Sequence, residues 1–354
     1  MENDHLRSLS PAASSRRVNR PTMRDIAARV GVSQALVSLV FRNAPGASPE
    51  TRERVFRAAA EMGYRPNTAA QVLRRSRSRQ IGVLFMMRQP FDVDLVEALY
   101  PAADRHGYHV VLGALGPGRD ERTAVEELLA FRCEAMILLG PTAEAAQLAA
   151  AGENMPVVDV ARRFSGDGVD VVRVADERGA RLAVDHLVSL GHRAIVHVDG
   201  GNLPGSAYRS RGYEKAMLRH HLGREVRILP GDHTEESGAS AARQLMGEDR
   251  LPTALFASND RCAHGVLATL VRAGVGVPDD VSVIGFDDSG VARLSFIDLT
   301  TIRQDVTRMA ESAVDAIVER LEHGRTVARE IVLEPSLIVR GTTGPPGLFA
   351  TTTG

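Results

Sequence analysis

Carboxylate and amide side chains gather where apolar, strand-like runs of the sequence end. Asp159 lies in the run PVVDVA, Asn259 and Asp260 close TALFASND, and Asp287 and Asp288 close VSVIGFDD. Such groups could bind a metal ion, or they could hold hydroxyl or carboxylate groups of a small molecule together with an arginine. Because no histidine lies at a matching i, i+4 spacing, the pattern favours a small-molecule site. We expect no metal ion and no cofactor.

Common catalytic motifs are missing from the sequence. It contains no nucleophile elbow, no Walker loop and no G-x-G-x-x-G directly after a strand. His220 and His221 are adjacent, so on a helix they diverge, and Cys133 and Cys262 lack metal-ligand spacing. We therefore expect no catalytic residues and no enzymatic activity. A further possibility is an enzyme with a binding-protein fold, which would show catalytic turnover of the molecule bound in its cleft.

The polar groups must be positioned by the alternating pattern that begins near residue 79. Strand-like runs alternate with amphipathic helical stretches, which predicts parallel sheets with right-handed crossovers. A first half contains IGVLFMM, YHVVLGAL, AMILLG, PVVDVA and VDVVRV, and a second half contains AIVHVDG, EVRILPG, TALFASND and VSVIGFDD. Ligands of such folds bind beyond the carboxyl ends of the strands, where the polar groups lie.

Positive charge is concentrated before that pattern begins. Residues 1–80 contain 15 Arg and 6 Asp or Glu, a net charge of +9, while the remainder has 28 basic and 38 acidic residues, a net charge of -10. A basic head on an acidic body predicts that the head alone contacts a polyanion such as DNA. For residues 1–20, rich in Pro, Ser, Ala and Arg, we expect a disordered basic tail.

Composition indicates a globular protein of two or three domains, with 354 residues of which 44% are hydrophobic. The N-terminus has no apolar signal-peptide core, and no segment approaches 18 uninterrupted apolar residues. We therefore expect a cytoplasmic, nucleoid-associated protein with no membrane contact.

Three short helices are predicted in the head. Thr22 is a favourable N-cap for a helix that ends at Gly31, and Ser33 can cap a second helix after a tight turn. Two short helices joined by a turn that contains glycine form a helix-turn-helix unit. Ser48 and the following Pro-Glu pair open a third helix, which stops at Gly63.

The second helix has two distinct faces on a helical wheel. The face predicted to pack on the first helix contains Leu36, Val37, Val40 and Phe41. The outward face contains Gln34, Ala35, Ser38, Leu39 and Arg42. A solvated helix would carry more charge on its outward face, so this composition suits a surface that presses against another molecule.

The segment TMRDIAARVGVSQALVSLVFRNAPGASPETRERVFRAAAEMGYRPNTAAQVLRRSRSRQIGVLF resembles the head and hinge of the lac-repressor (LacI/GalR) family of bacterial transcription regulators. The resemblance implies an all-α helix-turn-helix head at 21–64 and a hinge helix and linker at 65–78. It also implies an α/β core at 79–343, similar to periplasmic binding proteins, with two Rossmann-like subdomains. These are an N-subdomain of about 79–173 and 304–333 and a C-subdomain of about 174–303 and 334–343. Residues 344–354 are expected to form a disordered tail.

That resemblance implies a set of DNA contacts. Gln34 and Ala35 match the main base-reading pair, and Leu39 matches a third reader that is typically Arg. The remaining expected contacts are Thr22, Ser33 and Ser38 near phosphates, Arg42, Arg52 and Arg54 on phosphates, Asn67 and Ala70 in the hinge, and Leu73 as the wedge inserted between base pairs. Gln can bond adenine through a bidentate pair, whereas Ala and Leu can only pack on thymine methyl groups.

Eight core residues match effector contacts of the family. Arg209 matches the arginine that grips the effector, with Arg211 as the alternative if the register is shifted. The other matches are Phe91 and His233 as apolar or ring contacts, Asn259, Asp287 and Gln304 as polar contacts, and Arg132 with Asp159 as a pair near the floor of the cleft.

We therefore expect a DNA-binding transcriptional regulator, most simply a repressor, that binds a palindromic double-stranded operator as a homodimer. A helix-turn-helix contacts one half-site, so a two-fold protein matches a two-fold operator. The expected effector is a small molecule, a sugar or a sugar derivative. The alternative is a periplasmic-type ligand-binding protein without a DNA role, which would require a signal peptide and no basic head.

Overall fold

A computed structural model describes residues 21–64, 77–141, 155–161 and 168–347. It divides into two compact units, Met1–Arg77 and Ser78–Gly354, and each is described by itself. The predictions for the tail 1–20, for the hinge residues Asn67, Ala70 and Leu73, and for residues 348–354 lie outside the described residues. Within the described ranges, no helix is long and apolar enough to cross a membrane.

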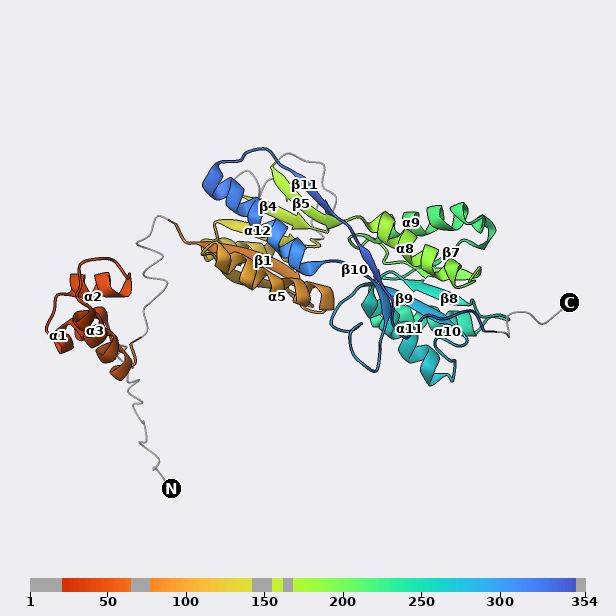
Figure 1. The fold of residues 1–354 in the computed structure, drawn as a ribbon, viewed down its shortest axis with the longest axis horizontal. Coiled ribbons are helices and arrows are strands. Elements are labelled where there is room, and N and C mark those ends of the chain that lie inside the picture. Colours follow the sequence, from red (N-terminus) through yellow and green to blue (C-terminus); the bar gives the residue numbers. More distant parts are fainter. Residues whose placement is uncertain (1–20, 65–76, 142–154, 162–167, 348–354) are drawn as a thin grey trace, which may run out of the picture. The chain divides into compact units, whose positions relative to one another are not determined.

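The head contains the three predicted helices, α1 (Met23–Val30), α2 (Gln34–Phe41) and α3 (Pro49–Glu61) (Figure 1). Thr22 caps α1 in a reciprocal arrangement, because its hydroxyl accepts from the Asp25 amide while the Asp25 carboxylate accepts from the Thr22 amide. Ser33 caps α2 in the same position. Gly31 ends α1 at φ 74°, a conformation that glycine adopts without a steric penalty.

Aliphatic side chains form the core of the head. Ile26 and Val30 of α1 pack with Val37 and Val40 of α2 and with Val55 of α3, all of them buried. The prediction that Leu36 and Phe41 are also core residues is correct only in part, since both are partly exposed. Phe41 lies at the margin of the core, where its ring meets those of Phe56 and Tyr64.

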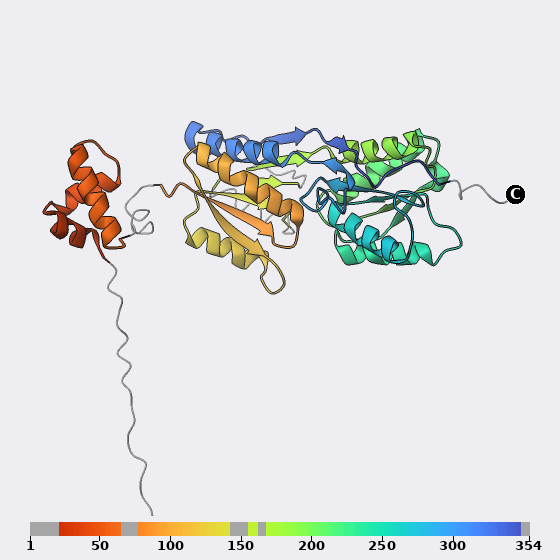
Figure 2. The same cartoon turned by 60° about the horizontal axis from the view of Figure 1, so that its bottom comes forward.

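Two six-stranded sheets form the second unit (Figures 1 and 2). The first has the order β11-β5-β4-β3-β1-β2 and is entirely parallel. Its strands are β1 (Gln80–Met86), β2 (His109–Leu115), β3 (Ala135–Leu139), β4 (Val157–Val160), β5 (Val169–Val174) and β11 (Glu330–Leu333). The Val- and Leu-rich central strands are those of a parallel sheet covered on both faces.

The second sheet has the order β12-β10-β9-β8-β6-β7, in which only β12 is antiparallel to its neighbour. Its strands are β6 (Ile195–Val198), β7 (Arg227–Leu229), β8 (Ala254–Ala257), β9 (Ser282–Asp287), β10 (Thr300–Arg303) and β12 (Ser336–Ile338). The nine strands predicted from sequence are confirmed as β1 to β9, whereas the short strands β10, β11 and β12 were not predicted.

Helices cover both faces of each sheet (Figure 2). The first sheet carries α5 (Pro90–Arg105) and α12 (Val306–His323) on one face and α6 (Glu121–Ala130) on the other. The second carries α8 (Asp176–Ser189) and α9 (Ser206–Arg219) on one face and α10 (Glu235–Met246) and α11 (Asp260–Arg272) on the other. We call these two layered bodies the N-subdomain and the C-subdomain.

The chain passes between the two subdomains three times. It crosses between β5 and α8, between β10 and α12, and between β11 and β12. Gln304 therefore lies in a connection between the subdomains, one residue after β10 ends. These crossings hold the carboxyl ends of the parallel strands of both sheets around one shared space.

Candidate nucleic-acid interface and ligand cavity

The outward face of α2 is the surface on which the sequence places the base-reading residues. Gln34 and Ala35 are exposed in its first turn, and Ser38 is partly exposed. Within the described residues, the Gln34 side chain makes no hydrogen bond, so its amide is available to another molecule. The contact of these residues with DNA remains a prediction.

Leu39 is partly buried because it lies against the loop that follows α2. A Cβ atom placed on Gly46 would lie 3.4 Å from Leu39 Cδ1, and Gly46 itself has φ 118°. An arginine at position 39 could not pack on this loop in the same way. Leu39 therefore packs the outward face of α2 against the loop that follows this helix.

Arg52 and Arg54 hold the backbone of the head. Arg52 donates from Nη1 to Asn43 Oδ1 at 3.0 Å and from Nη2 to the Ala44 carbonyl, while Arg54 donates from Nη2 to the Val30 carbonyl at 2.7 Å. Among the described residues, neither forms an ion pair, so no carboxylate offsets their positive charge. Their predicted phosphate contacts would come from guanidinium groups that already fix the loop after α2 and the end of α1.

Arg42 is an exposed cation beside the reading face. Its Nε donates to the Ser38 carbonyl at 3.2 Å, which leaves both terminal nitrogens unused within the described residues. By contrast, Arg29 and Arg57 are paired with Glu61 and Glu53. Within the described residues, Arg42 and Arg54 thus make one hydrogen bond each to their own chain, fewer than Arg52.

A cavity of about 380 Å³ lies between the N-subdomain and the C-subdomain. Apolar side chains such as Leu95, Leu139 and Val160 line it from the N-subdomain, and Leu203 and Pro204 line it from the C-subdomain. Of the residues predicted to contact a ligand, the structure places six in its lining: Phe91, Arg209, His233, Asn259, Asp287 and Gln304.

The structure does not place the predicted pair of Arg132 and Asp159 in the cavity lining. Arg132 is exposed and precedes β3, so it lies at the amino end of that strand, whereas the cavity lies at the carboxyl ends. Asp159 is fully buried within β4, and the cavity is lined instead by the next residues, Val160 and Ala161. Side chains alternate between the faces of a strand, which turns Asp159 away from Val160.

Arg209 is the central cation of the cavity, and the alternative Arg211 is exposed on α9. Arg209 Nε donates to Asp176 Oδ1 at 2.8 Å, and Nη1 donates to the Ser258 carbonyl at 2.6 Å. Its guanidinium carbon also lies 3.7 Å from the centroid of the Phe286 ring. Burial raises the pKa of Asp176, and the charge of Arg209 opposes that rise.

Asp287 faces the cavity from the end of β9. Its Oδ1 accepts from Gln304 Nε2 at 2.8 Å and lies 3.7 Å from Arg209 Nη1. Burial raises the pKa of Asp287 to about 7, although Arg209 acts in the opposite direction. The backbone of Asp287 has φ 122°, an unfavourable conformation for a non-glycine residue that is characteristic of functional sites.

Asn259 and His233 form another part of the lining. Asn259 Oδ1 caps α11 by accepting from the Cys262 amide at 2.8 Å, and its Nδ2 donates to the His233 carbonyl at 3.3 Å. Burial lowers the pKa of His233 to about 3, so the ring is neutral. Asn259 therefore also has a structural role, which leaves less of its amide for a ligand.

Asp92 was missed by the sequence analysis, although it lies in the first turn of α5 and lines the cavity. Its Oδ2 accepts from the Met86 amide at 2.9 Å, and burial raises its pKa to about 7. The available signal was its position, since an acidic residue a few positions after the first predicted strand, at the start of the next helix, lies near a carboxyl end.

Comparison with known proteins identifies the protein family. Residues 22–67 match the model described as bacterial regulatory proteins, lacI family, and residues 184–343 match the model of a periplasmic binding protein-like domain. The lactose operon repressor of Escherichia coli (strain K12) is 33% identical over 335 residues, which span 92% of this chain and 91% of that protein. The chain belongs to the lacI family.

Solved structures agree with this assignment. A LacI transcriptional regulator from a Rhodococcus species is 47% identical with a TM-score of 0.73, covering 75% of this chain and 98% of that one. The lac repressor dimer bound to operator and the anti-inducer ONPF is 32% identical with a TM-score of 0.77, covering 92% and 99%. This lacI-family protein is a DNA-binding transcriptional regulator.

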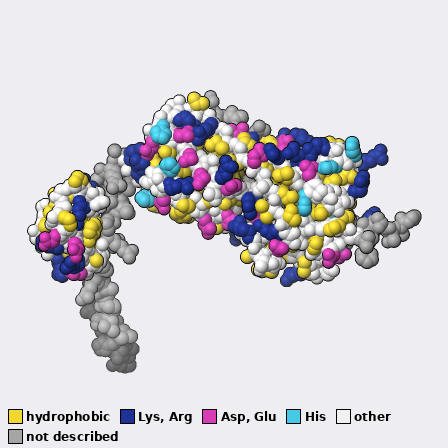
Figure 3. Space-filling view, in the orientation of Figure 1, with side chains coloured by type: hydrophobic (Ala, Val, Ile, Leu, Met, Phe, Trp, Pro, Cys, Tyr) yellow, Lys and Arg dark blue, Asp and Glu magenta, His cyan; other side chains and the backbone are white. Residues whose placement is uncertain are grey.

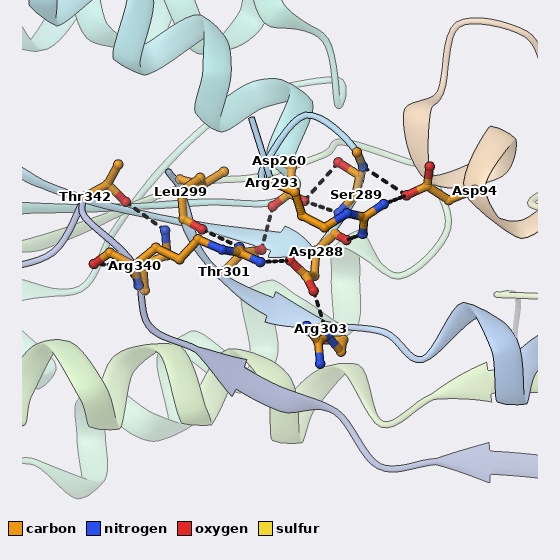
Figure 4. Close-up of polar contacts among 12 residues, drawn as sticks. Asp94, Asp260, Asp288, Ser289, Arg293, Leu299, Thr301, Arg303, Arg340 and Thr342 are labelled. Carbon is orange, nitrogen blue, oxygen red and sulfur yellow. Dashed lines mark hydrogen bonds and ion pairs between the residues drawn. The ribbon is translucent and has the colours of Figure 1, made fainter. Parts of the chain in front are cut away.

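A polar network joins the two subdomains of the regulator beside the cavity (Figure 4). Asp94 of α5 accepts from the Gly290 amide and from Arg293 Nη2, both at 2.9 Å. Arg293 also donates to the Asp288 carbonyl, and the Asp288 carboxylate pairs with Arg303 of β10 at 2.6 Å. The network therefore connects the helix that carries Asp92 to the loop after β9 and to a strand that leads between the subdomains.

We expect Asp92→Asn to stabilise the ligand-free regulator at alkaline pH. The pKa of Asp92 is about 7 in the folded chain and near 3.8 when unfolded, so the folded state binds the extra proton between these values. The free energy of unfolding of the wild type therefore falls as pH rises from about 4 to about 7. The variant lacks this loss and should be more stable by about 1–3 kcal/mol at pH 8.

Chemical denaturation at pH 5 and pH 8 measures this effect. Glu97→Gln, an exposed change on the same helix, is the control and should leave the free energy of unfolding unchanged at both pH values. A variant at Asp92 that is less stable than the wild type at pH 8 would contradict the electrostatic account.

Proposed function

We propose that this lacI-family regulator is a repressor that binds a palindromic operator as a homodimer and responds to a sugar-like effector in the cavity. One observation carries the proposal: a single chain combines an exposed α2 reading face with a cavity lined from both subdomains. The lac repressor structure, a dimer bound to operator and an anti-inducer, supports this by similarity. The regulator is proposed to act in the cytoplasm, at the nucleoid.

Contact with DNA is assigned to the head. Gln34 is proposed to bond a base, with Ala35 and Leu39 packing on thymine methyl groups, and Arg42 with Arg52 and Arg54 to neutralise phosphates. Thr22, Ser33 and Ser38 would lie near the backbone, and the hinge residues Asn67, Ala70 and Leu73 would enter the minor groove. The face of the core shown in Figure 3 mixes acidic, basic and apolar side chains, which does not favour a polyanion.

Effector control is assigned to movement of the two subdomains. A ligand that contacts both walls favours one arrangement of the subdomains, and any change in that arrangement must alter the Asp94–Arg293 contact. Because linkage is reciprocal, the factor by which the effector changes operator affinity must equal the factor by which operator changes effector affinity.

Removal of the head should separate the two functions. The compact unit Ser78–Gly354 is expected to remain folded and dimeric and to bind the effector, but to lose all affinity for DNA. Sedimentation and gel-shift assays of residues 78–354 and of the full chain test this. A monomeric core would contradict the assignment of dimerisation to the second unit, and DNA binding by the core would contradict the assignment of DNA contacts to the head.

A further inference from the structure

The cavity of the regulator has one anchored carboxyl group on each wall. Asp92 projects from the N-subdomain and Asp287 from the C-subdomain, and both line the same space. One oxygen of each is held by the protein, since Asp92 Oδ2 accepts from the Met86 amide and Asp287 Oδ1 accepts from Gln304. In the described part of the chain, Asp92 Oδ1 and Asp287 Oδ2 accept no hydrogen bond.

The two carboxyl groups are near enough to influence each other. Burial is the main cause of the raised pKa of Asp287, and the charge of Asp92 raises it further. Asp92 has no cationic partner among the described residues. The two free oxygens therefore form a pair of acceptors, on opposite walls, that repel each other when both groups are ionised.

The cations of the cavity are more fully engaged than its acids. Arg209 is bonded to Asp176 and to the Ser258 carbonyl, and Arg261 is paired with Glu235 at 2.5 Å. Among the described residues Arg88 forms no ion pair or hydrogen bond, but it is exposed, on the loop after β1. Within the described residues, Nη2 of Arg209 and exposed Arg88 keep donor capacity, while each wall also presents one free carboxylate oxygen, from Asp92 and from Asp287.

Apolar surface covers much of the remaining wall. Leu95 and Leu139 line the N-subdomain side, and Leu203 and Pro204 line the C-subdomain side. A ring with C–H groups on its face and hydroxyl groups at its edge is complementary to such a wall. A phosphate or a carboxylate in the same place would bring acceptors and negative charge to two acidic groups.

We propose that Asp92 is a specificity-determining residue and that Asp92 and Asp287 together select a neutral or amino-substituted polyol, whose hydroxyl or ammonium groups donate to both walls. Anionic sugars are rejected by the same pair. A ligand that bridges the two carboxyl groups also ties the N-subdomain to the C-subdomain. The inference rests on the proposed function in one respect, that the cavity is the effector site.

The test uses the full-length regulator and a panel of matched compounds. Glucose, galactose, ribose and lactose are compared with glucosamine, galactosamine, glucuronate, galacturonate, glucose 6-phosphate and ribose 5-phosphate by thermal shift, and each hit is titrated by calorimetry. We expect the hits to be neutral or amino sugars. Binding confined to uronates or phosphates, or binding by no member of the panel, would overturn the inference.

Substitutions then test the role of Asp92. Asp92→Asn keeps the shape and an acceptor for the Met86 amide but replaces one acceptor by a donor, so affinity for the hit should fall at least tenfold. Glu97→Gln, which removes a charge from the exposed side of the same helix, should leave affinity unchanged. Asp92→Ser is the second variant if the Asn variant does not fold. Unchanged affinity in a folded Asp92 variant would overturn the proposal.

Operator binding by the same preparation reports separately on the proposed function. A wild type that binds an operator but only anionic sugars keeps the proposed function and overturns this inference. A wild type that binds neutral sugars through Asp92 but binds no DNA keeps this inference and overturns the proposed function.

Discussion

Arg209→Ala is expected to lower the free energy of unfolding by about 3–5 kcal/mol at pH 8, because it leaves buried acidic groups without their cation. Arg209 and Asp176 are each 5% exposed in their side chains and lie 2.8 Å apart. Asp287 lies 3.7 Å from the same guanidinium group. The substitution also removes the cation over Phe286, so the loss combines charge and packing.

The penalty should depend on pH in a defined direction. Without Arg209, the folded-state pKa values of Asp176 and Asp287 rise further above the unfolded value near 3.8. Protonation then stabilises the folded chain in acid, so the variant loses stability as pH rises through the range between those values. The deficit relative to the wild type should be larger at pH 8 than at pH 5.

Arg211→Ala is the matched control for this change. Arg211 is on the same helix, is 51% exposed, pairs with Glu177 at 3.8 Å and lies over the Tyr208 ring. Thermal and chemical unfolding at both pH values, together with ligand titration, separate the two arginines. Equal stability of the two variants, or a deficit independent of pH, would contradict the role of Arg209 as the central cation.

The second large effect is expected at Gln34. Its amide is exposed at the start of α2 and unused within the described residues, and a bidentate contact with adenine contributes about 1–3 kcal/mol. A dimer makes the contact twice, so Gln34→Ala should weaken binding to the selected operator at least about 30-fold. Affinity for unrelated DNA should not change, because phosphate contacts determine it.

Arg42→Ala provides the contrast. Its guanidinium group is exposed beside α2, so its loss should weaken binding to all sequences by a similar factor and reduce the salt dependence by about one unit for each head. Anisotropy titrations at several salt concentrations, on operator and on unrelated DNA, measure both variants. If the two variants behave alike, Gln34 does not determine sequence preference.

The local signals in the sequence were sufficient for the head and for nine strands. The helix boundaries could be predicted because the capping residues Thr22, Ser33 and Gly31 act through local hydrogen bonds and backbone conformation. The strands β1 to β9 could be predicted from runs of apolar residues. The three remaining strands adjoin the crossings between the subdomains, and the pairing of β11 and β12 depends on partners distant in the sequence.

A cavity residue could be predicted where it ends a strand, as Asp287 does, or where the family resemblance supplied the register, as for Arg209. Asp176 could not be predicted as the partner of Arg209, because nothing local indicates an ion pair across 33 positions. Arg132 failed for a physical reason: it stands before β3, at the end of the strand opposite the cavity. Asp92 was missed for the opposite reason: it lies at the end of the strand where the cavity is, but no sequence motif surrounds it.

Selection of operators from random double-stranded DNA by the full-length protein tests the central claim most directly. The account predicts enrichment of an inverted repeat whose half-sites lie about one helical turn apart, with A·T pairs where Ala35 and Leu39 face the bases. No enrichment over the input pool, or enrichment of a single asymmetric site, would contradict it.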